Sequence, residues 1–188
     1  MSHTKTYLAE TTLIASAIRV TDIERMVDGL VEVRQRFGRL FVAGLGGSAA
    51  NASHATNDFR QLCGINAHCL TDNVASVTAR ANDLGWQRCL DLSHAGQNDA
   101  LLVLSVGGGA DGVSTPLVEA AVDIKKLGGT LLGIVGRDGG YIAKHADRCI
   151  IVPTVSDIRV TPHTEGWQMV ILHCIVSHPN LQRNSTKW

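Results

Sequence analysis

Apolar residues recur along the chain with two different periods. From about Lys5 to Phe37 they return every three or four positions among charged residues, so we expect one or two long amphipathic helices there. Further along, five short apolar runs end near Gly, Thr or Pro and have the length of buried strands. These runs are RLFVAG (39–44), NAHCLT (66–71), ALLVLSV (100–106), TLLGIVG (130–136) and RCIIVPT (148–154).

Helical spacing fills the intervals between the predicted strands. The helical segments lie at roughly 48–62, 74–94, 113–127 and 139–146, and a last helix covers about Thr164–Ser177. Strands that alternate with helices predict right-handed crossovers and an open parallel sheet covered on both faces. A chain of 188 residues without a linker or internal repeat favours a single α/β domain with one continuous core.

The composition is that of a soluble globular protein, with 45% hydrophobic and 18% charged residues. Lysine and arginine number 17, as do aspartate and glutamate, so no net positive charge points to a nucleic-acid partner. No apolar run reaches the ~20 residues of a membrane span. Five cysteines without CxxC spacing fit reduced thiols. We therefore expect a cytoplasmic protein with neither a nucleic-acid nor a membrane partner.

Three glycine-rich junctions follow predicted strands: GLGGS (44–48), SVGGGADG (105–112) and GRDGG (136–140). In open parallel sheets, ligands bind beyond the carboxyl ends of the strands, where these junctions fall. Glycines let backbone N–H groups approach an anion, and a helix N-terminus favours negative charge. Neither GxGxxG nor GK[ST] occurs in the first loop, so we expect no nucleotide cofactor and favour a sugar phosphate. A tight structural turn is the alternative.

Two predicted helices each carry an imidazole and a carboxylate. His54 and Asp58 lie four residues apart, and Glu165 and His173 lie eight apart, so each pair can face one side of its helix. Carboxylates and histidines can move protons near neutral pH, and the same set could bind zinc. The alternative is a surface carboxylate in each case and, for His173, a buried histidine in an apolar helix.

In their order and spacing, these motifs resemble the SIS (sugar isomerase) domain of the sedoheptulose 7-phosphate (phosphoheptose) isomerase family. That family has GNGGS where this chain has GLGGS, followed by a helix with a histidine and, four residues on, a glutamate. ANDLGW (81–86) resembles the family's GxDFG, and GRDGG resembles its GKDGG. EGWQMVILH (165–173) resembles the last helix, where the family has a glutamine and, eight residues on, a histidine.

The resemblance implies a single SIS domain over residues 1–188, with a helical segment at 1–37 and a three-layer αβα sandwich at 38–188 around a five-stranded parallel sheet. It implies a homotetramer with active sites at subunit interfaces. The implied activity is ketose–aldose isomerisation of sedoheptulose 7-phosphate to a heptopyranose 7-phosphate through an enediol(ate), as in heptose biosynthesis. Some members look like zinc proteins, with ligands at the positions of His54, Asp58, Glu165 and His173.

The resemblance and the chemistry together assign roles. We expect His173 to act as acid and base at the substrate oxygens, while Asp58 and Glu165 compete for the role of the base at carbon. The substrate-binding candidates are Gly46, Gly47, Ser48, Asn73, Asp83, Ser105, Gly107 and Gly108. Weaker candidates for substrate contacts are Asp72, Asn82, Arg137, Asp138 and His163.

The chain departs from the family pattern in its loops and its acids. Leu45 replaces the asparagine of GNGGS, and SVGGGA replaces the hydroxyl-rich phosphate loop STSGNS, so phosphate would rely on backbone N–H groups. The family's glutamate is Asp58, and its glutamine is Glu165. Two alternatives therefore stay open. One is an isomerase of another seven- or eight-carbon sugar phosphate, and the other is a non-catalytic SIS protein that binds a sugar phosphate or a protein partner.

Overall fold

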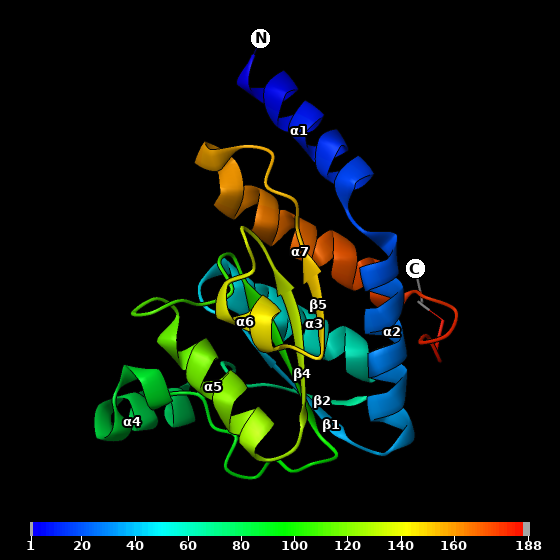
Figure 1. Cartoon of the computed structure of the whole chain (residues 1–188). Coiled ribbons are helices and arrows are strands. Elements are labelled where there is room, and N and C mark those ends of the chain that lie inside the picture. Colours follow the sequence, from blue (N-terminus) through cyan, green and yellow to red (C-terminus); the bar gives the residue numbers. More distant parts are fainter. Residues whose placement is uncertain (1, 186–188) are drawn as a thin grey trace.

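A five-stranded parallel sheet forms the centre of the computed structural model, which describes residues 2–185 (Figure 1). The strand order is β2-β1-β3-β4-β5, and each neighbouring pair runs parallel. The sequence predictions for the strands and for a parallel sheet are confirmed. The strands are β1 (Arg39–Ala43), β2 (Asn66–Cys69), β3 (Ala100–Ser105), β4 (Thr130–Val135) and β5 (Arg148–Ile151).

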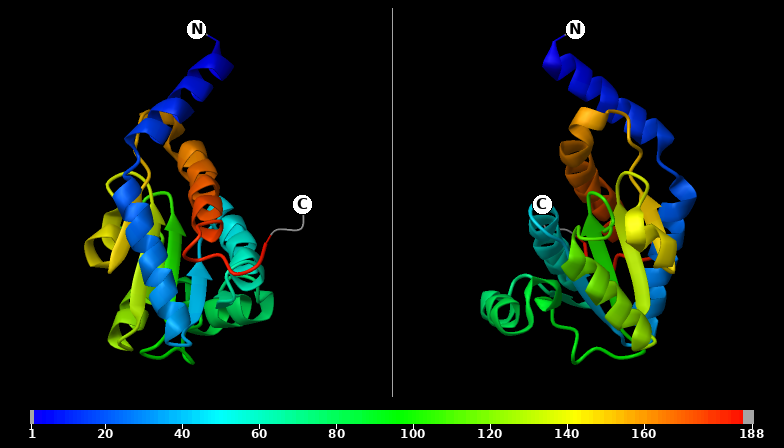
Figure 2. Two further views of the ribbon diagram at one scale, coloured as in Figure 1. Left: turned by 90° about the vertical axis from the view of Figure 1, so that its right-hand side faces the viewer. Right: turned by 60° about the vertical axis from the view of Figure 1, so that its left-hand side comes forward.

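Helices cover both faces of the sheet, which confirms the three-layer αβα sandwich (Figure 2). One face is covered by α2 (Val20–Gln35), α3 (Gly47–Gln61) and α7 (Val160–Val176). The other is covered by α5 (Thr115–Lys126) and α6 (Gly140–His145), with α4 (Val74–Leu84) at the edge. The apolar side chains of the strands alternate between these two cores, because successive residues of a strand point to opposite faces.

The first helix, α1 (His3–Ala17), projects beyond the layers and rests on the start of α7 (Figures 1 and 2). Its contact is polar as well as apolar, because Glu10 hydrogen-bonds to Arg159 and His163 while Tyr7 stacks on the His163 ring. Leu8 and Leu13 of α1 remain exposed. The helical N-terminal segment predicted from periodicity is therefore two helices with different surroundings.

Two helices differ from their predicted bounds. The segment at 74–94 is helical to Leu84, where Gly85 takes a φ of 88° and a short 3₁₀ turn (Trp86–Arg88) follows. The last helix begins at Val160 rather than near Thr164, because Pro162 lies inside its first turn, where the missing N–H costs no hydrogen bond.

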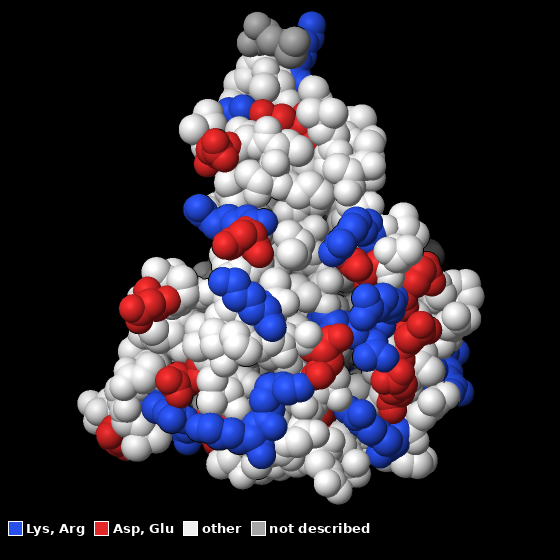
Figure 3. Space-filling view, viewed as in Figure 1, with Lys and Arg blue, Asp and Glu red and all other residues white. Residues whose placement is uncertain are grey.

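Charged side chains of both signs are mixed over the face seen in Figure 3. Within residues 2–185, no helix combines the length and the apolarity needed to cross a bilayer.

Candidate active site

The first glycine-rich loop joins β1 to α3 and is held close to α7. Gly46 is the residue before the helix, with a φ of 60° that favours glycine. A Cβ atom at Gly47 would overlap the carboxylate of Glu165, so the glycine allows α7 to approach the loop. Asn51 of α3 strengthens the contact by donating from Nδ2 to the Glu165 carbonyl at 2.9 Å and to Oε1 of Gln168 at 2.9 Å.

The second and third glycine-rich loops interlock through their backbones. The amides of Tyr141 and Ile142 donate to the carbonyls of Gly109 and Gly108 at 2.7 and 2.9 Å. A Cβ atom at Gly108, where φ is 68°, would overlap the carbonyl oxygen of Gly139. The glycines at this point are therefore required by the close approach of two loops, which the sequence did not indicate.

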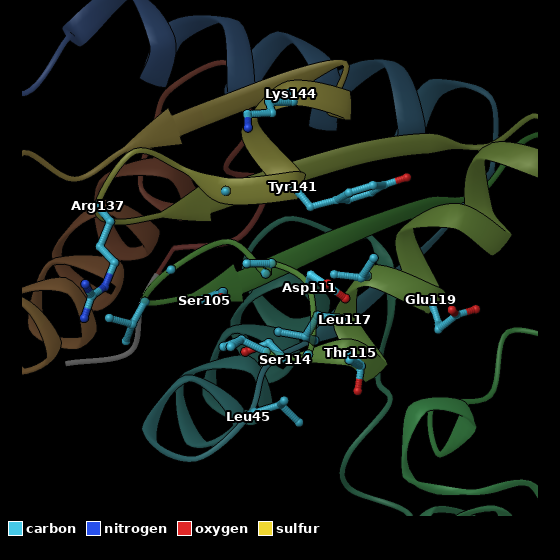
Figure 4. Close-up of a pocket in the computed structure, with 18 of the residues that line it drawn as sticks. Leu45, Ser105, Asp111, Ser114, Thr115, Leu117, Glu119, Arg137, Tyr141 and Lys144 are labelled. Carbon is cyan, nitrogen blue, oxygen red and sulfur yellow. The ribbon is translucent and has the colours of Figure 1, made fainter.

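A pocket of about 1090 Å³ opens where these loops meet, between α5 and α6 (Figure 4). Three of the predicted substrate-binding residues line it: Ser48, Ser105 and Gly107. The Ser105 hydroxyl accepts a hydrogen bond from the Gly108 amide at 3.1 Å. The Ser48 hydroxyl is buried and has no hydrogen-bond partner among the described residues, so it can serve a ligand.

The pocket also contains residues that sequence reasoning did not single out. Ser114 and Thr115 line it at the start of α5, and Tyr141 and Lys144 line it from α6. The signal for the first two was present, because Ser-Thr-Pro is a typical helix start and places its hydroxyls at the helix N-terminus. Leu45, which replaces the family asparagine, also lines the pocket.

A second group of side chains lies on the outer side of α3 and α7. Nε2 of His54 lies 3.2 Å from Oδ2 of Asp58 and 3.4 Å from Nε2 of His173, and Nε2 of His173 lies 3.8 Å from the same Asp58 oxygen. Asp58 is 8% exposed, whereas both imidazoles are exposed. The apolar neighbours of His173 in sequence face the core, but His173 itself faces outward.

Glu165 does not join this group within one chain. Glu165 lies beside Gly47, the first residue of α3. Because eight residues of α7 separate it from His173, the two lie about 12 Å apart along the helix axis. The structure thus brings together three of the four residues predicted for a shared site. None of the three lines the pocket between α5 and α6.

Asn73 and Asp83 lie on or next to α4, away from the pocket lining. The Asn73 side chain caps α4 by accepting from the Ser76 amide at 3.1 Å, and Asp83 accepts from Asn82 at 2.8 Å. No residue of α4 is buried. The substrate-binding role expected for Asn73 and Asp83 stays a prediction.

The group of His54, Asp58 and His173 fits a divalent metal ion. Its donor atoms lie within 4.8 Å of one another. Four ligands at about 2.0–2.1 Å from a tetrahedral zinc ion are separated from each other by roughly 3.3–3.4 Å, which is close to the separations found here. Two imidazoles and a carboxylate leave one position open, as catalytic zinc sites do.

Known proteins resemble this chain in sequence over most of its length. A phosphoheptose isomerase of Chlorobaculum parvum is 32% identical to it, over 82% of this chain and 75% of that protein. Another, from Roseiflexus sp. strain RS-1, is 31% identical over 73% of this chain and 72% of that protein. The chain belongs to the phosphoheptose isomerase family. The resemblance seen in the loop and helix motifs is thereby confirmed, although no family model matches the sequence.

The fold of a solved phosphoheptose isomerase agrees with this assignment. The structure from Neisseria gonorrhoeae superposes with a TM-score of 0.80 over 92% of this chain and 94% of that chain, at 23% identity. At this identity the likeness concerns the fold alone.

Proposed function

We propose that this protein interconverts sedoheptulose 7-phosphate and a heptopyranose 7-phosphate as a ketose–aldose isomerase. The observation that carries the proposal is the meeting of one buried carboxylate, Asp58, with two exposed imidazoles in a member of the phosphoheptose isomerase family. Such a set supplies a base and an acid at neighbouring positions, which is what the isomerisation requires.

The reaction needs two proton movements that leave the substrate's composition unchanged. A base removes a proton from C1 of the ketose while an acid protonates O2, which gives an enediol(ate). The proton is then returned to C2 while O1 loses its own proton, and the product is the aldose. We assign the carbon proton to Asp58 and the oxygen protons to His173, whose imidazole can both give and accept a proton near neutral pH.

Glu165 is the competing base at carbon. Its carboxylate has the greater reach but lies beside Gly47, about 12 Å along α7 from His173. We therefore favour Asp58, and we place Glu165 near the first loop, where it can contact the sugar.

The alternative that we propose for the same three residues, His54, Asp58 and His173, is that they hold a zinc ion instead of transferring protons themselves. When bound there, zinc would polarise substrate oxygens and stabilise negative charge that develops on them. Stoichiometric zinc in protein purified without added metal, retained on dialysis, is the expected result. Its absence would remove the metal from the proposal.

We further propose that the protein is a cytoplasmic homotetramer whose active sites lie at subunit interfaces, on a single SIS domain. The support is geometric: the group of three does not line the pocket of its own chain, and Leu8 and Leu13 of α1 are exposed. The pocket of one chain, combined with His54, Asp58 and His173 of a neighbouring chain, would form a complete active site.

The direct test is incubation with sedoheptulose 7-phosphate and detection of a heptose 7-phosphate by mass spectrometry and NMR. Asp58→Asn and His173→Gln should each lower kcat by at least about 100-fold, because each removes a proton-transfer group. Asp28→Asn on α2 and His178→Gln beyond the end of α7 are matched controls. Neither residue belongs to the pocket or to the group of three, so both variants should retain activity.

A second candidate is an isomerase of another seven- or eight-carbon sugar phosphate. Leu45 favours it, because an apolar side chain lines the pocket where the family has an asparagine. A panel of such sugar phosphates in the same assay decides between the two. No turnover of any of them, with or without zinc, would leave the non-catalytic binding protein as the explanation.

A further inference from the structure

The pocket between α5 and α6 contains two cations without a carboxylate partner. Arg137 and Lys144 both line it, and among the described residues neither forms a salt bridge or a side-chain hydrogen bond. Three carboxylates line the same pocket. Glu119 is paired with Arg88 at 3.0 Å, and Asp138 accepts from the Gly140 amide at 3.1 Å, whereas Asp111 forms no salt bridge or side-chain hydrogen bond within residues 2–185. Glu119 and Asp138 are therefore engaged elsewhere, and Arg137, the cation whose side chain lies against Gly107 of the second loop, remains available to an anionic ligand.

Arg137 is placed over the second glycine-rich loop. It lies two residues beyond the end of β4 and has a φ of 52°, a left-handed conformation that is uncommon outside glycine. A Cβ atom built at Gly107 would lie 3.6 Å from Cδ and 4.0 Å from Nε of Arg137. The side chain of Arg137 therefore occupies the space beside Gly107, at the end of the pocket where Ser105 lies (Figure 4).

This arrangement coincides with the loss of hydroxyl groups from the loop. Position by position against STSGNS, Val106 and Gly107 stand where a threonine and a serine are expected. A second donor points to the same ligand, because Ser48 lines the pocket, is 1% exposed and has a hydroxyl without a hydrogen-bond partner in the described part of the chain. A buried hydroxyl left unpaired in a protein of this kind indicates a ligand or an ordered water.

We propose that Arg137 binds the phosphate group of the substrate directly and replaces the hydroxyls that this loop lacks. The inference rests on the proposed function for the identity of the substrate, but not for the presence of a phosphate site. A guanidinium presents several N–H donors in one plane and matches two phosphate oxygens at once. Phosphate binding by this chain is then more dependent on charge, and more sensitive to salt, than binding by hydroxyls and amides.

The test is calorimetric binding of two probes, inorganic phosphate and sedoheptulose 7-phosphate, at low ionic strength. Arg137→Gln should weaken the binding of both by about 10–100-fold, because a charge-assisted hydrogen bond to a dianion is lost. Arg137→Lys keeps the charge and should recover part of the loss. Lys144→Gln removes the other unpaired cation of the pocket and is the matched control, with an expected change below about threefold.

A rescue variant separates direct contact from a general effect of charge. Gly107→Ser restores a hydroxyl at the loop, and no atom of residues 2–185 outside the immediate chain neighbours lies closer than 3.6 Å to the position of its Cβ atom. In the Arg137→Gln background it should recover at least about tenfold in phosphate affinity, which is the size of one good hydrogen bond to a charged group. If Arg137→Gln does not fold, Arg137→Gly removes the same cation and suits the left-handed backbone.

Several outcomes overturn the inference. They are unchanged phosphate binding by Arg137→Gln, equal losses with Arg137→Gln and Lys144→Gln, and wild-type protein that binds neither probe. Failure of the proposed function has a different result. In that case the wild-type protein binds inorganic phosphate through Arg137 as expected but does not convert sedoheptulose 7-phosphate.

Discussion

Oε2 of Glu10 in α1 lies 2.8 Å from Nε2 of His163 in α7, although 153 positions separate the two residues in the sequence. The same carboxylate accepts two hydrogen bonds from the guanidinium of Arg159, at 2.7 and 2.5 Å. These bonds hold the pKa of Glu10 at about 2, below its ordinary value of 4.5, chiefly through Arg159 and then His163. The projecting helix is thereby tied to the turn of α7 that leads to Glu165.

Removing the Glu10 carboxylate should loosen this connection. Glu10→Ala leaves Arg159 and His163 without their acceptor, and His163 is buried, so the loss is larger than that of a surface ion pair. We expect Tm to fall by roughly 3–8 °C in thermal unfolding followed by circular dichroism. Glu32→Gln, which breaks the exposed pair with Arg148, is the matched control and should change Tm by less than about 2 °C. Equal shifts in the two variants would contradict a special role for Glu10.

The same carboxylate gives a pH dependence of stability. Because its pKa is lower in the folded protein than in the unfolded chain, its contribution is complete above pH 4.5 and is lost as the pH falls from there toward 2. The difference in Tm between the wild type and Glu10→Gln should therefore be constant near neutral pH and shrink below about pH 4.5. A difference that grows as the pH falls would show that another group is responsible.

Metal content should separate the four residues predicted as zinc ligands. His54→Gln and His173→Gln should reduce bound zinc from about one per chain to less than about a fifth of that, because each removes a nitrogen donor. Glu165→Gln should keep its zinc, since Glu165 lies beside Gly47 and outside the group of three. Loss of zinc from Glu165→Gln would instead show that this residue completes the site in the assembled protein. Elemental analysis of dialysed protein measures all three variants.

Mixed oligomers test whether the pocket and the group of three act across chains. Val106→Glu places a negative charge in the pocket, and Asp58→Asn removes the base, so each variant alone should be inactive. If one chain supplies the pocket and another the base, co-expression in equal amounts should restore roughly a quarter of wild-type activity in a tetramer. Sites made within one chain would give no recovery, because every chain then carries one of the two changes. Sedimentation of the same samples reports the oligomeric state.

The contact between the second and third loops makes Gly108 sensitive to substitution. Gly108→Ala places a methyl group on the Gly139 carbonyl in addition to the cost of a φ of 68°, so we expect a loss of at least about 3 kcal/mol or failure to fold. Gly112→Ala is the matched control, with a φ of 71° and no described residue within 4 Å of the new methyl group. It should cost only about 1–2 kcal/mol in urea unfolding. Similar losses in both variants would mean that backbone conformation alone accounts for the effect.

The sheet could be predicted from the sequence because each strand is a short apolar run that stops at a turn residue. The helix ends were predicted less accurately than the strands. The start of α7 is an example, because Pro162 suggests a break in a helix but is tolerated in the first turn. The pairing of His54 with Asp58 follows from their spacing, and His173 joins them because α7 packs on α3.

Glu165 shows what spacing alone does not give. Viewed down the axis of α7, Glu165 and His173 lie on similar faces, but the rise along eight residues separates them by about 12 Å. The sequence also does not reveal that Gly108 and Gly140 allow two loops to pack closely. An anion-binding loop and a loop–loop contact favour glycine equally, so the residue type does not distinguish them.

The amides at the start of α6 point at the Gly108 and Gly109 carbonyls, so two of the three loops around the pocket form one rigid backbone unit. Natural variation can hardly reshape such a unit, because nearly any added side chain would force the two turns apart. New substrate preferences in this lineage would instead have to arise at the bordering positions that tolerate exchange. Leu45, Val106 and Arg137 line the pocket at such positions, so we expect differences in substrate preference between relatives to follow the residues found there.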